Sequence, residues 1–245
     1  MHYCYLPTLT DSTHEIRITN KNEIHHIKNV LRLKKENTLH LFNGKYLKAL
    51  GSIMTINEKE IFIEIKQFIQ EEVEQPKIIL ACAIPKKGKF ETIIEKTTEL
   101  GVAEIIPLET QYSDVRLKSD QISKKLIRYQ TVAINASKQS KRTTIPIIHP
   151  VTKFTDILAT LISRSTVFIP SLENKRENIL QSFKQMKVTD TIAFMIGPEG
   201  DFSSKEYTLA QKKGCIPISL GKTILKVETA AICSIACARQ FYHPF

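Results

Sequence analysis

From residue 77 onward, short apolar runs alternate with longer segments that have the periodicity of helices. Residues 77–84 predict a strand, residues 90–100 a helix that ends at Gly101, and residues 104–108 a second strand. The alternation continues with strands expected over residues 166–169, 191–196 and 216–220 and helices over residues 121–140, 155–162, 178–186, 203–213 and 228–242. Strands that are separated by helices pair in parallel, so we expect an α/β domain built on a parallel sheet.

The preceding part of the chain has a different pattern, typical of short antiparallel strands. Strands are expected over residues 38–42, 46–56 and 61–69, with turns at Asn43-Gly44 and at residues 57–59. Before them, residues 23–33 predict a helix with one apolar face and with basic side chains elsewhere. We therefore expect a small antiparallel barrel or sheet that carries a basic helix.

An acidic segment separates the two patterns. Residues 71–76 lack apolar periodicity and end in Pro76, as linkers do. We expect a first domain over residues 1–75 and a second over residues 76–245. The length of 245 residues permits this division, since a domain takes roughly 150 residues.

Composition excludes several classes of protein. The chain is 42% hydrophobic and 24% charged, as folded proteins are, and its apolar runs fall far short of the roughly 18 residues that span a bilayer. The N-terminus lacks the features of a secretory signal, so we expect a cytoplasmic protein. Five cysteines, odd in number and widely spaced, favour buried thiols over disulfides. Cys233 and Cys237 lie four residues apart, but no nearby Cys or His pair completes a metal site.

The positive charge is concentrated in two places. The formal net charge is +10, and it lies in the second part of the chain, because the first 75 residues contain equal numbers of basic and acidic side chains. Residues 116–142 form the larger cluster, with one acidic side chain among many basic ones. The smaller cluster follows His25-His26 and contains Lys28, Arg32, Lys34 and Lys35. Two such clusters favour RNA as the partner, and the alternative is a solvated basic surface.

The segment Gly197-Pro198-Glu199-Gly200 lies between the expected strand at 191–196 and a helix whose start has the Ser-x-x-Glu form of a capping box. Open α/β sheets bind ligands at such strand ends. The glycines permit a tight turn and a close backbone approach by a small molecule. An ordinary strand–helix connection is the alternative, and the motif is not the Gly-x-Gly-x-x-Gly of dinucleotide folds.

A second loop of this kind follows the last expected strand. Residues 220–231 open a helix that is rich in small residues. Lys226 lies just before this helix, where the helix dipole disfavours a cation. Its position indicates a role toward a substrate, with simple solvent exposure as the alternative.

Five segments in order resemble the RsmE-type 16S ribosomal RNA uridine N3-methyltransferases of the SPOUT superfamily. They are HHIKNVLR, KKGKFETIIEKTTELGVAEIIPL, NASKQSKRTTIP, IGPEGDFSSKE and LGKTILKVETAA. The resemblance implies an N-terminal PUA-like β-barrel that binds RNA and a C-terminal SPOUT domain with a deep trefoil knot. It also implies S-adenosylmethionine (SAM) as cofactor, 16S ribosomal RNA or the small ribosomal subunit as substrate, and a homodimer. Pattern alone would predict an ordinary doubly wound sheet, because chains avoid knots.

The resemblance and the charge pattern together assign site residues. In the family, the matching loops surround SAM, which here gives Gly197, Pro198, Glu199, Gly200, Leu220, Gly221, Ile224 and Leu225, with Pro170 and Leu172 in a third wall. RNA contacts are expected from His25, His26, Lys28, Arg32, Arg116, Arg128, Lys138, Gln139, Lys141 and Arg142. Lys226 and Arg142 are the cations expected to stabilise charge on the uracil, and Glu199 either acts as the base or orients its loop. Because the methyl group of SAM is already activated, no metal is expected.

The chain departs from the family pattern at three places. It has Gly200-Asp201 where the family usually has Gly-Gly, Lys226 where it usually has Arg, and Asn135-Ala136 where it usually has Glu-Ala. Lysine keeps the cation of arginine but loses the planar, two-pronged donor. Asn135 lacks a carboxylate, which puts the identity of any catalytic carboxylate in doubt.

Two other functions stay open at this point. A related SPOUT enzyme that methylates a ribose hydroxyl or transfer RNA would keep the SAM loops but not the HHIKNVLR segment. A non-enzymatic RNA-binding or ribosome-assembly protein would explain the charge pattern alone.

Overall fold

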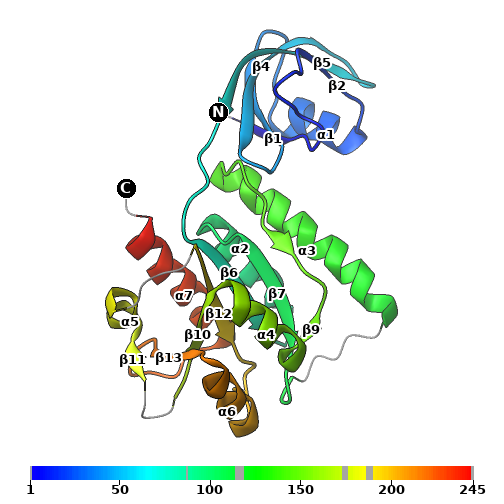
Figure 1. Cartoon of the computed structure of the whole chain (residues 1–245). Coiled ribbons are helices and arrows are strands. Elements are labelled where there is room, and N and C mark those ends of the chain that lie inside the picture. The colour runs from blue at the N-terminus through cyan, green and yellow to red at the C-terminus, as the bar shows by residue number, and fades with distance from the viewer. Residues whose placement is uncertain (1, 87, 114–118, 173–175, 186–189, 244–245) are drawn as a thin grey trace. The chain divides into compact units, whose positions relative to one another are not determined.

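The computed structural model describes residues 2–86, 88–113, 119–172, 176–185 and 190–243. These residues form two compact units (Figure 1). The first unit contains Met1–Val73 and Ser137–Ile145, and the second contains Glu74–Ala136 and Pro146–Phe245. The chain first passes from one unit to the other between Val73 and Glu74, within the acidic segment that was predicted to be a linker.

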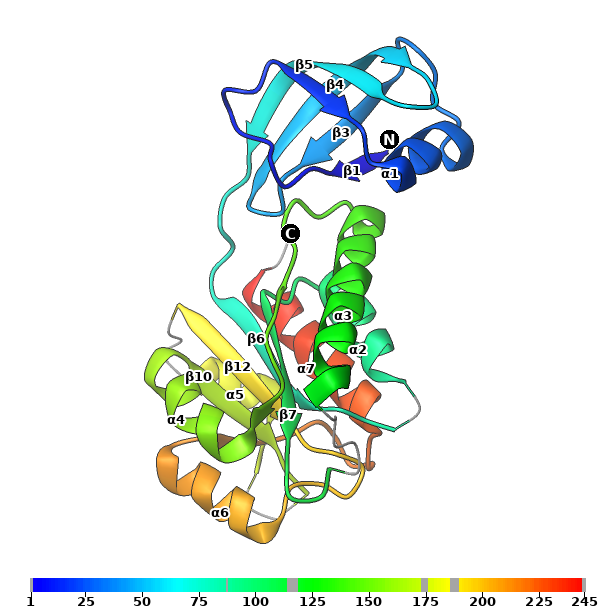
Figure 2. The same cartoon turned by 90° about the vertical axis from the view of Figure 1, so that its right-hand side faces the viewer.

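The first unit is built on a five-stranded mixed sheet (Figure 2). Its strand order is β1 (Tyr3–Tyr5), β3 (Thr38–Phe42), β4 (Leu47–Ile56), β5 (Ile61–Gln70) and β2 (Glu15–Ile18). The pairings of β3 with β4 and of β4 with β5 are antiparallel, as expected. In addition, β2 pairs antiparallel with β5, and β1 pairs parallel with β3. The sequence analysis missed β1 and β2, because runs of three and four residues carry too little alternation. Alternate side chains of β4, such as Ala49 and Ile53, lie in the core of this unit.

The helix expected over residues 23–33 is shorter and irregular. The segment forms α1 (Lys21–His25), followed by a π-helical turn, η1 (His26–Val30). The Asn20 side chain caps α1 by accepting hydrogen bonds from two backbone N–H groups of the first turn. Ile24 and Ile27 are buried, but Val30 is 59% exposed. The π-turn changes the helical register, so the expected apolar face is only partly buried.

Residues 137–145, which the sequence analysis placed in the second domain, belong to the first unit. The Lys138 ammonium lies 2.9 Å from the Glu23 carboxylate, and Thr144 forms an isolated β-bridge with Gly44. Such contacts join residues that are far apart in the chain and leave no periodicity in the sequence. The expected domain boundaries stay a prediction, and by their contacts residues 137–145 lie with the first unit.

The second unit is built on an eight-stranded sheet. Its order is β11 (Glu177–Asn178), β13 (Ile216–Ser219), β10 (Thr166–Pro170), β12 (Thr191–Ile196), β6 (Lys77–Ala83), β7 (Glu104–Glu109) and β8 (Ile147–Ile148), and β9 (Thr152–Lys153) also pairs with β7. All pairings among the described residues of this sheet are parallel. The parallel sheet expected from the strand–helix alternation is confirmed.

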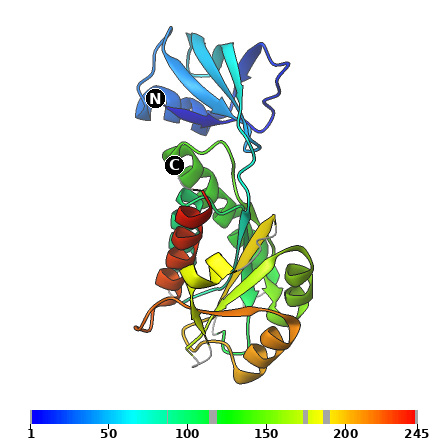
Figure 3. The same ribbon diagram turned by 60° about the vertical axis from the view of Figure 1, so that its left-hand side comes forward.

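Helices cover both faces of this sheet (Figure 3). They are α2 (Phe90–Glu99), α3 (Ser119–Ser140), α4 (Phe154–Arg164), α5 (Ile179–Gln185), α6 (Ser204–Lys213) and α7 (Val227–Tyr242). On one face, Ala193 and Met195 of β12 belong to the same core cluster as residues of α4 and α6. On the other face, Phe194 stacks on Phe168, and α7 packs against β12 and β6. The strands are therefore apolar on both sides, which explains their uninterrupted apolar sequences.

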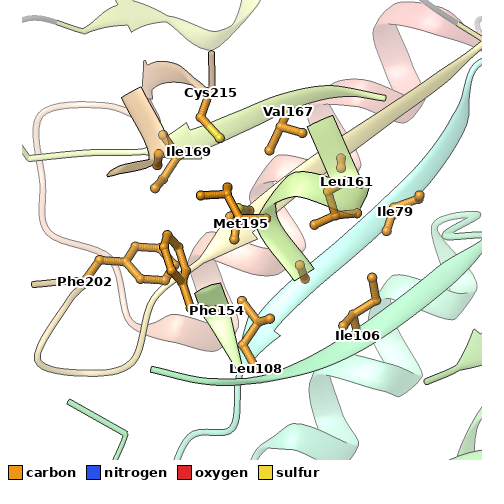
Figure 4. Packing of buried hydrophobic residues seen from close by; sticks show 14 of the residues in the cluster. Ile79, Ile106, Leu108, Phe154, Leu161, Val167, Ile169, Met195, Phe202 and Cys215 are labelled. Carbon is orange, nitrogen blue, oxygen red and sulfur yellow. The ribbon is translucent and has the colours of Figure 1, made fainter. Parts of the chain in front are cut away.

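The core between the sheet and α4 is shown in Figure 4. Met195, Val167 and Ile79 extend from neighbouring strands toward Leu161 and Phe154 of α4. All five are buried. This packing stabilises the pairing of β10, β12 and β6, in which the C-terminal ends of neighbouring strands lie side by side.

The cysteines behave largely as the sequence predicts. All five lie in the described part of the chain and are free; Cys4, Cys82 and Cys215 are buried, and Cys233 and Cys237 are half-buried. Burial raises the pKa of Cys215 to about 12, so its thiol is neutral at physiological pH.

Among the described residues, no helix is long and apolar enough to cross a membrane. The trefoil knot implied by the family resemblance stays a prediction.

Glu104, at the start of β7, contacts His149 and Arg164 in the second unit. Nε2 of His149 donates to Oε2 of Glu104 at 2.8 Å, and the Arg164 guanidinium contacts both carboxylate oxygens at 2.9 and 3.0 Å. The His149 hydrogen bond, followed by the Arg164 contact, lowers the pKa of Glu104 to about 2, whereas burial alone would raise it.

We expect Glu104 to make the stability of the protein depend on pH in the acidic range. Because its pKa is lower in the folded state than in the unfolded state, the carboxylate stabilises the fold above about pH 4.3, and this contribution of about 2 kcal/mol is lost as the pH falls toward about 2. Denaturant unfolding of Glu104→Gln should show a free-energy deficit at pH 6 that shrinks at pH 3. Glu109→Gln, on the same strand, is the control, and equal deficits in the two variants would contradict the assignment.

Candidate functional site

Three neighbouring parallel strands, β13, β10 and β12, end at the same edge of the second unit. The loops that follow them enclose a cavity of about 280 Å³. Nine of the ten residues expected to hold a cofactor line it: Pro170, Leu172, Gly197, Pro198, Glu199, Leu220, Gly221, Ile224 and Leu225. Gly200 is exposed and does not line the cavity. The sequence motifs therefore converge on one site in the fold.

The loop after β12 is packed tightly around Gly197. A Cβ atom built there would lie 3.1 Å from the backbone nitrogen of Phe202 and 3.2 Å from Oδ1 of Asp201. Glycine at this position therefore lets the loop fold back against its own residues.

A tyrosine hydroxyl connects two walls of the cavity. The hydroxyl oxygen of Tyr207, on α6, lies 2.9 Å from the carbonyl oxygen of Pro170 at the end of β10 and 2.8 Å from Oδ1 of Asp201. Asp201 has φ +62°, and its Oδ1 also accepts a hydrogen bond from the N–H of Phe202. Aspartate tolerates this left-handed conformation better than most residues. Asp201, noted above as a departure from the family pattern, is therefore a structural link in this chain.

Glu199 contacts the loop that follows β6. Its Oε1 atom accepts a hydrogen bond from the backbone N–H of Lys86 at 3.0 Å. This contact holds two loops together and uses one of the carboxylate oxygens. It matches the alternative in which Glu199 orients its loop.

The loop after β13 combines exposed apolar and basic side chains. Gly221 has φ +130°, a conformation that other residues rarely adopt. Ile224 is 81% exposed although it lines the cavity. Lys226 is the N-cap residue of α7, with an exposed side chain that makes no capping hydrogen bond. Lys226 therefore lines the cavity at the positive end of a helix.

Arg176 also lines the cavity, although no sequence motif predicted it. Its Nη1 atom donates a hydrogen bond to the carbonyl of Ser171 at 2.6 Å, and the side chain lines the cavity with Lys226. No motif contains Arg176, so only its position after the end of β10 could have indicated it.

The three residues expected to be catalytic are divided between the units. Lys226 and Glu199 line the cavity of the second unit. Arg142 belongs to the first unit, where its Nη2 atom donates to the Thr144 hydroxyl at 2.8 Å. The structure therefore brings together two of the three.

The basic residues expected near the first helix differ in their surroundings. Arg32 and His25 are exposed, whereas Lys28 forms an ion pair with Glu58. Burial, and then the nearby Lys138 ammonium, lower the pKa of His26, which favours its neutral form. Arg32 is therefore the clearest candidate for an RNA phosphate contact in this group.

The second group of expected RNA-binding residues is also uneven. Lys138 is paired with Glu23, and Arg128 with Glu91. Gln139 and Lys141 are exposed. Arg116 lies outside the described residues.

The described parts of the chain contain no group of three His, Cys, Asp or Glu side chains that is arranged to hold a metal ion.

Comparisons with known proteins agree with this fold. The chain matches the RNA methyltransferase domain family over residues 72–239 and the RNA methyltransferase PUA domain family over residues 18–66. It is 31% identical to ribosomal RNA small subunit methyltransferase E of Rickettsia conorii, over 96% of this chain and 93% of that protein. The relative of the same name from Mesomycoplasma hyopneumoniae is 35% identical over 85% of this chain and 87% of its own length.

Solved structures show the same similarity. Ribosomal RNA small subunit methyltransferase E from Neisseria gonorrhoeae, bound to SAM, superposes with a TM-score of 0.88 at 27% identity and covers 99% of this chain and 98% of its own. A putative methyltransferase from Legionella pneumophila, also with bound SAM, gives a TM-score of 0.85 at 28% identity, over 97% and 96% of the two chains. The resemblance seen in the sequence is confirmed, and the chain belongs to the ribosomal RNA small subunit methyltransferase E family, with an RNA methyltransferase domain and a PUA domain.

Proposed function

We propose that this protein transfers the methyl group of SAM to N3 of one uridine in 16S ribosomal RNA, acting on the small ribosomal subunit in the cytoplasm. The observation that carries the proposal is the cavity at the ends of β10, β12 and β13, because the segments that form it are those that the family resemblance assigns to SAM. Two relatives were solved with SAM bound. The protein is accordingly a SAM-dependent ribosomal RNA methyltransferase, and uridine N3 is the finer part of the proposal.

The cavity suits the chemical parts of SAM. Ile196, Leu220 and Ile224 provide apolar surface for an adenine ring, and the backbone of the loops provides hydrogen-bonding groups. The guanidinium of Arg176 provides a cation for the carboxylate of the methionine part. A volume of about 280 Å³ is near the lower end of small-molecule sites.

The residues around the cavity fit a transfer to a uracil nitrogen. SAM, when bound, supplies a methyl group activated by its sulfonium, so the chain has to align N3 and exclude water. N3 carries a proton and becomes a good nucleophile once this proton has passed to a solvent water molecule, before the methyl group is transferred. The Lys226 ammonium stabilises the negative charge that the ring oxygens then carry. Glu199 positions the loop through Lys86 rather than taking the proton.

A homodimer is part of this proposal. Arg142, the second expected cation, belongs to the first unit, whereas the cavity lies in the second. In the dimer implied by the family resemblance, Arg142 acts from a second copy. Sedimentation analysis of the purified protein tests this step.

Product analysis tests the whole proposal. The protein is incubated with labelled SAM and with small ribosomal subunits that lack the modification, beside naked 16S RNA, and the methylated nucleoside is identified by mass spectrometry. We expect 3-methyluridine at one site, formed on the assembled subunit. A ribose-methylated nucleoside, or SAM binding without any transfer to RNA, would contradict it.

Replacing Lys226 should slow the chemical step. We expect Lys226→Ala to lower kcat about 100-fold at saturating SAM, because a positioned cation is removed from the developing charge. Lys222→Ala is the matched control, since Lys222 is an exposed lysine of the same loop that does not line the cavity. Equal kcat values for Lys226→Ala and the wild type would rule out this role.

Replacing the Tyr207 hydroxyl should weaken SAM binding. Tyr207→Phe leaves the Pro170 carbonyl and the Asp201 carboxylate without their shared donor, so the two walls lose this link. We expect SAM to bind about fivefold more weakly by calorimetry, with kcat at saturating SAM little changed. Thr208→Ala removes an exposed hydroxyl from the same helix and serves as the control.

A double-mutant cycle with Asp201→Gly checks the Tyr207 result. If the two side chains act as one link, the second substitution should add little to the first. Additive losses of SAM affinity would show that they act separately.

Reversing the charge of Arg32 should weaken RNA binding. We expect Arg32→Glu to lower affinity for 16S RNA and to reduce the slope of log Kd against log salt by about one, if Arg32 contacts one phosphate. Lys66→Glu makes the same charge change at an exposed residue of β5 and is the control. An unchanged salt dependence in Arg32→Glu would remove the first unit from the RNA-binding surface.

A further inference from the structure

The turn after β7 presents an aromatic ring to solvent. Among the Phe and Tyr side chains that the structure describes, only Tyr112 is exposed, with 50% of its surface accessible. It is the third residue of a turn that begins at Thr110 and ends at Ser113. The Ser113 N–H donates to the Thr110 carbonyl at 3.2 Å, and the hydroxyls of these two buried residues lie 2.9 Å apart. The turn is therefore closed by its own hydrogen bonds.

The turn is also fixed to the segment that leads from the cavity into α6. The Gln111 N–H donates to Oε1 of Glu206 at 2.9 Å, while Oε2 of the same carboxylate accepts from the N–H of Ser203 at 2.8 Å. Glu206 is buried, so one carboxylate fastens the turn and caps the helix at the same time. These bonds limit the movement of the backbone that carries Tyr112.

Tyr112 lies directly beside the cofactor loop. A Cβ atom built on Gly200 would be 3.5 Å from Cβ of Tyr112, which is ordinary van der Waals contact. The neighbours of Gly200 in the chain, Glu199 and Asp201, both line the cavity. The exposed ring is therefore one residue away from the cavity wall.

We propose that Tyr112 stacks on an unpaired RNA base next to the uridine that is methylated. This step rests on the proposed function and adds a substrate-binding residue to it. N3 of uracil lies on the edge used in base pairing, so the uridine and its neighbours must be unpaired and partly unstacked before transfer. Aromatic side chains replace the lost stacking, and they do so for any base because every base has a π-face.

The surroundings of Tyr112 fit a base better than a core role. A ring that supported the fold would be buried, whereas half of Tyr112 is open to solvent. The backbone beneath it is held before any ligand arrives, so binding loses little conformational freedom. The protein has a formal net charge of +10. This charge attracts polyanionic RNA, whereas it does not attract an uncharged apolar protein surface.

The test compares side chains at position 112 in the full-length protein. Tyr112→Phe keeps the ring, Tyr112→Leu keeps apolar bulk without a ring, and Tyr112→Ala removes both. Leu180→Ala, which removes another exposed apolar side chain, is the control. For each variant we would measure SAM affinity, KM and kcat with small ribosomal subunits, 16S RNA binding by filter retention, and sedimentation.

Stacking predicts a specific order of effects. Tyr112→Ala and Tyr112→Leu should bind RNA about tenfold more weakly and raise KM to match, while Tyr112→Phe and Leu180→Ala stay near the wild type. SAM affinity and sedimentation should not change. Wild-type affinity in Tyr112→Ala, full rescue by leucine, or a changed oligomeric state would overturn the proposal. If the wild type forms no 3-methyluridine, the proposed function fails, and RNA retention still decides the role of Tyr112.

Discussion

The parallel pairing of β13, β10 and β12 determines where chemistry can take place in this protein. Helices cover both faces of the sheet, so its central strands carry mostly apolar, buried side chains on both sides. Polar and flexible residues are therefore confined to the loops at the strand ends. Since parallel strands end at the same edge, three loops from distant parts of the sequence meet in one cavity.

Loops that meet in this way have to be held in place, and α6 provides most of the links. Glu206 fastens the turn after β7, and Tyr207 reaches Asp201 and the end of β10. Asp201 replaces the glycine that the family usually has, and it occupies a left-handed conformation that glycine would adopt without strain. In return, its carboxylate accepts two hydrogen bonds that glycine could not. Asp201 therefore reduces the conformational freedom of the backbone, and its hydrogen bonds hold the loop in one conformation.

The sequence predicted the regular parts of the fold better than its long-range contacts. The bounds of β3 and β12 were predicted to the residue, because apolar patterning and adjacent turns are local signals. Nine cavity residues were found through family motifs, which record positions that periodicity does not reveal. Tyr207 and Arg176 were missed. The Tyr207 hydroxyl meets a carbonyl 37 positions earlier in the chain, and nothing in the residues near Tyr207 indicates that partner. Residues 137–145 belong to the first unit for a similar reason, since their contacts are with residues that are distant in the sequence.

The net charge overstates the number of cations that are free to meet RNA. Lys28, Arg128 and Lys138 all contribute to the basic clusters seen in the sequence, yet each forms an ion pair within the fold. The pairs of Lys28 and Arg128 are solvent-accessible, and RNA phosphates can compete for those cations at little cost. Lys138 is different, because its side chain is 13% exposed and breaking its pair would leave the Glu23 carboxylate without its cation. Lys138 therefore serves to join residues 137–145 to the rest of the first unit.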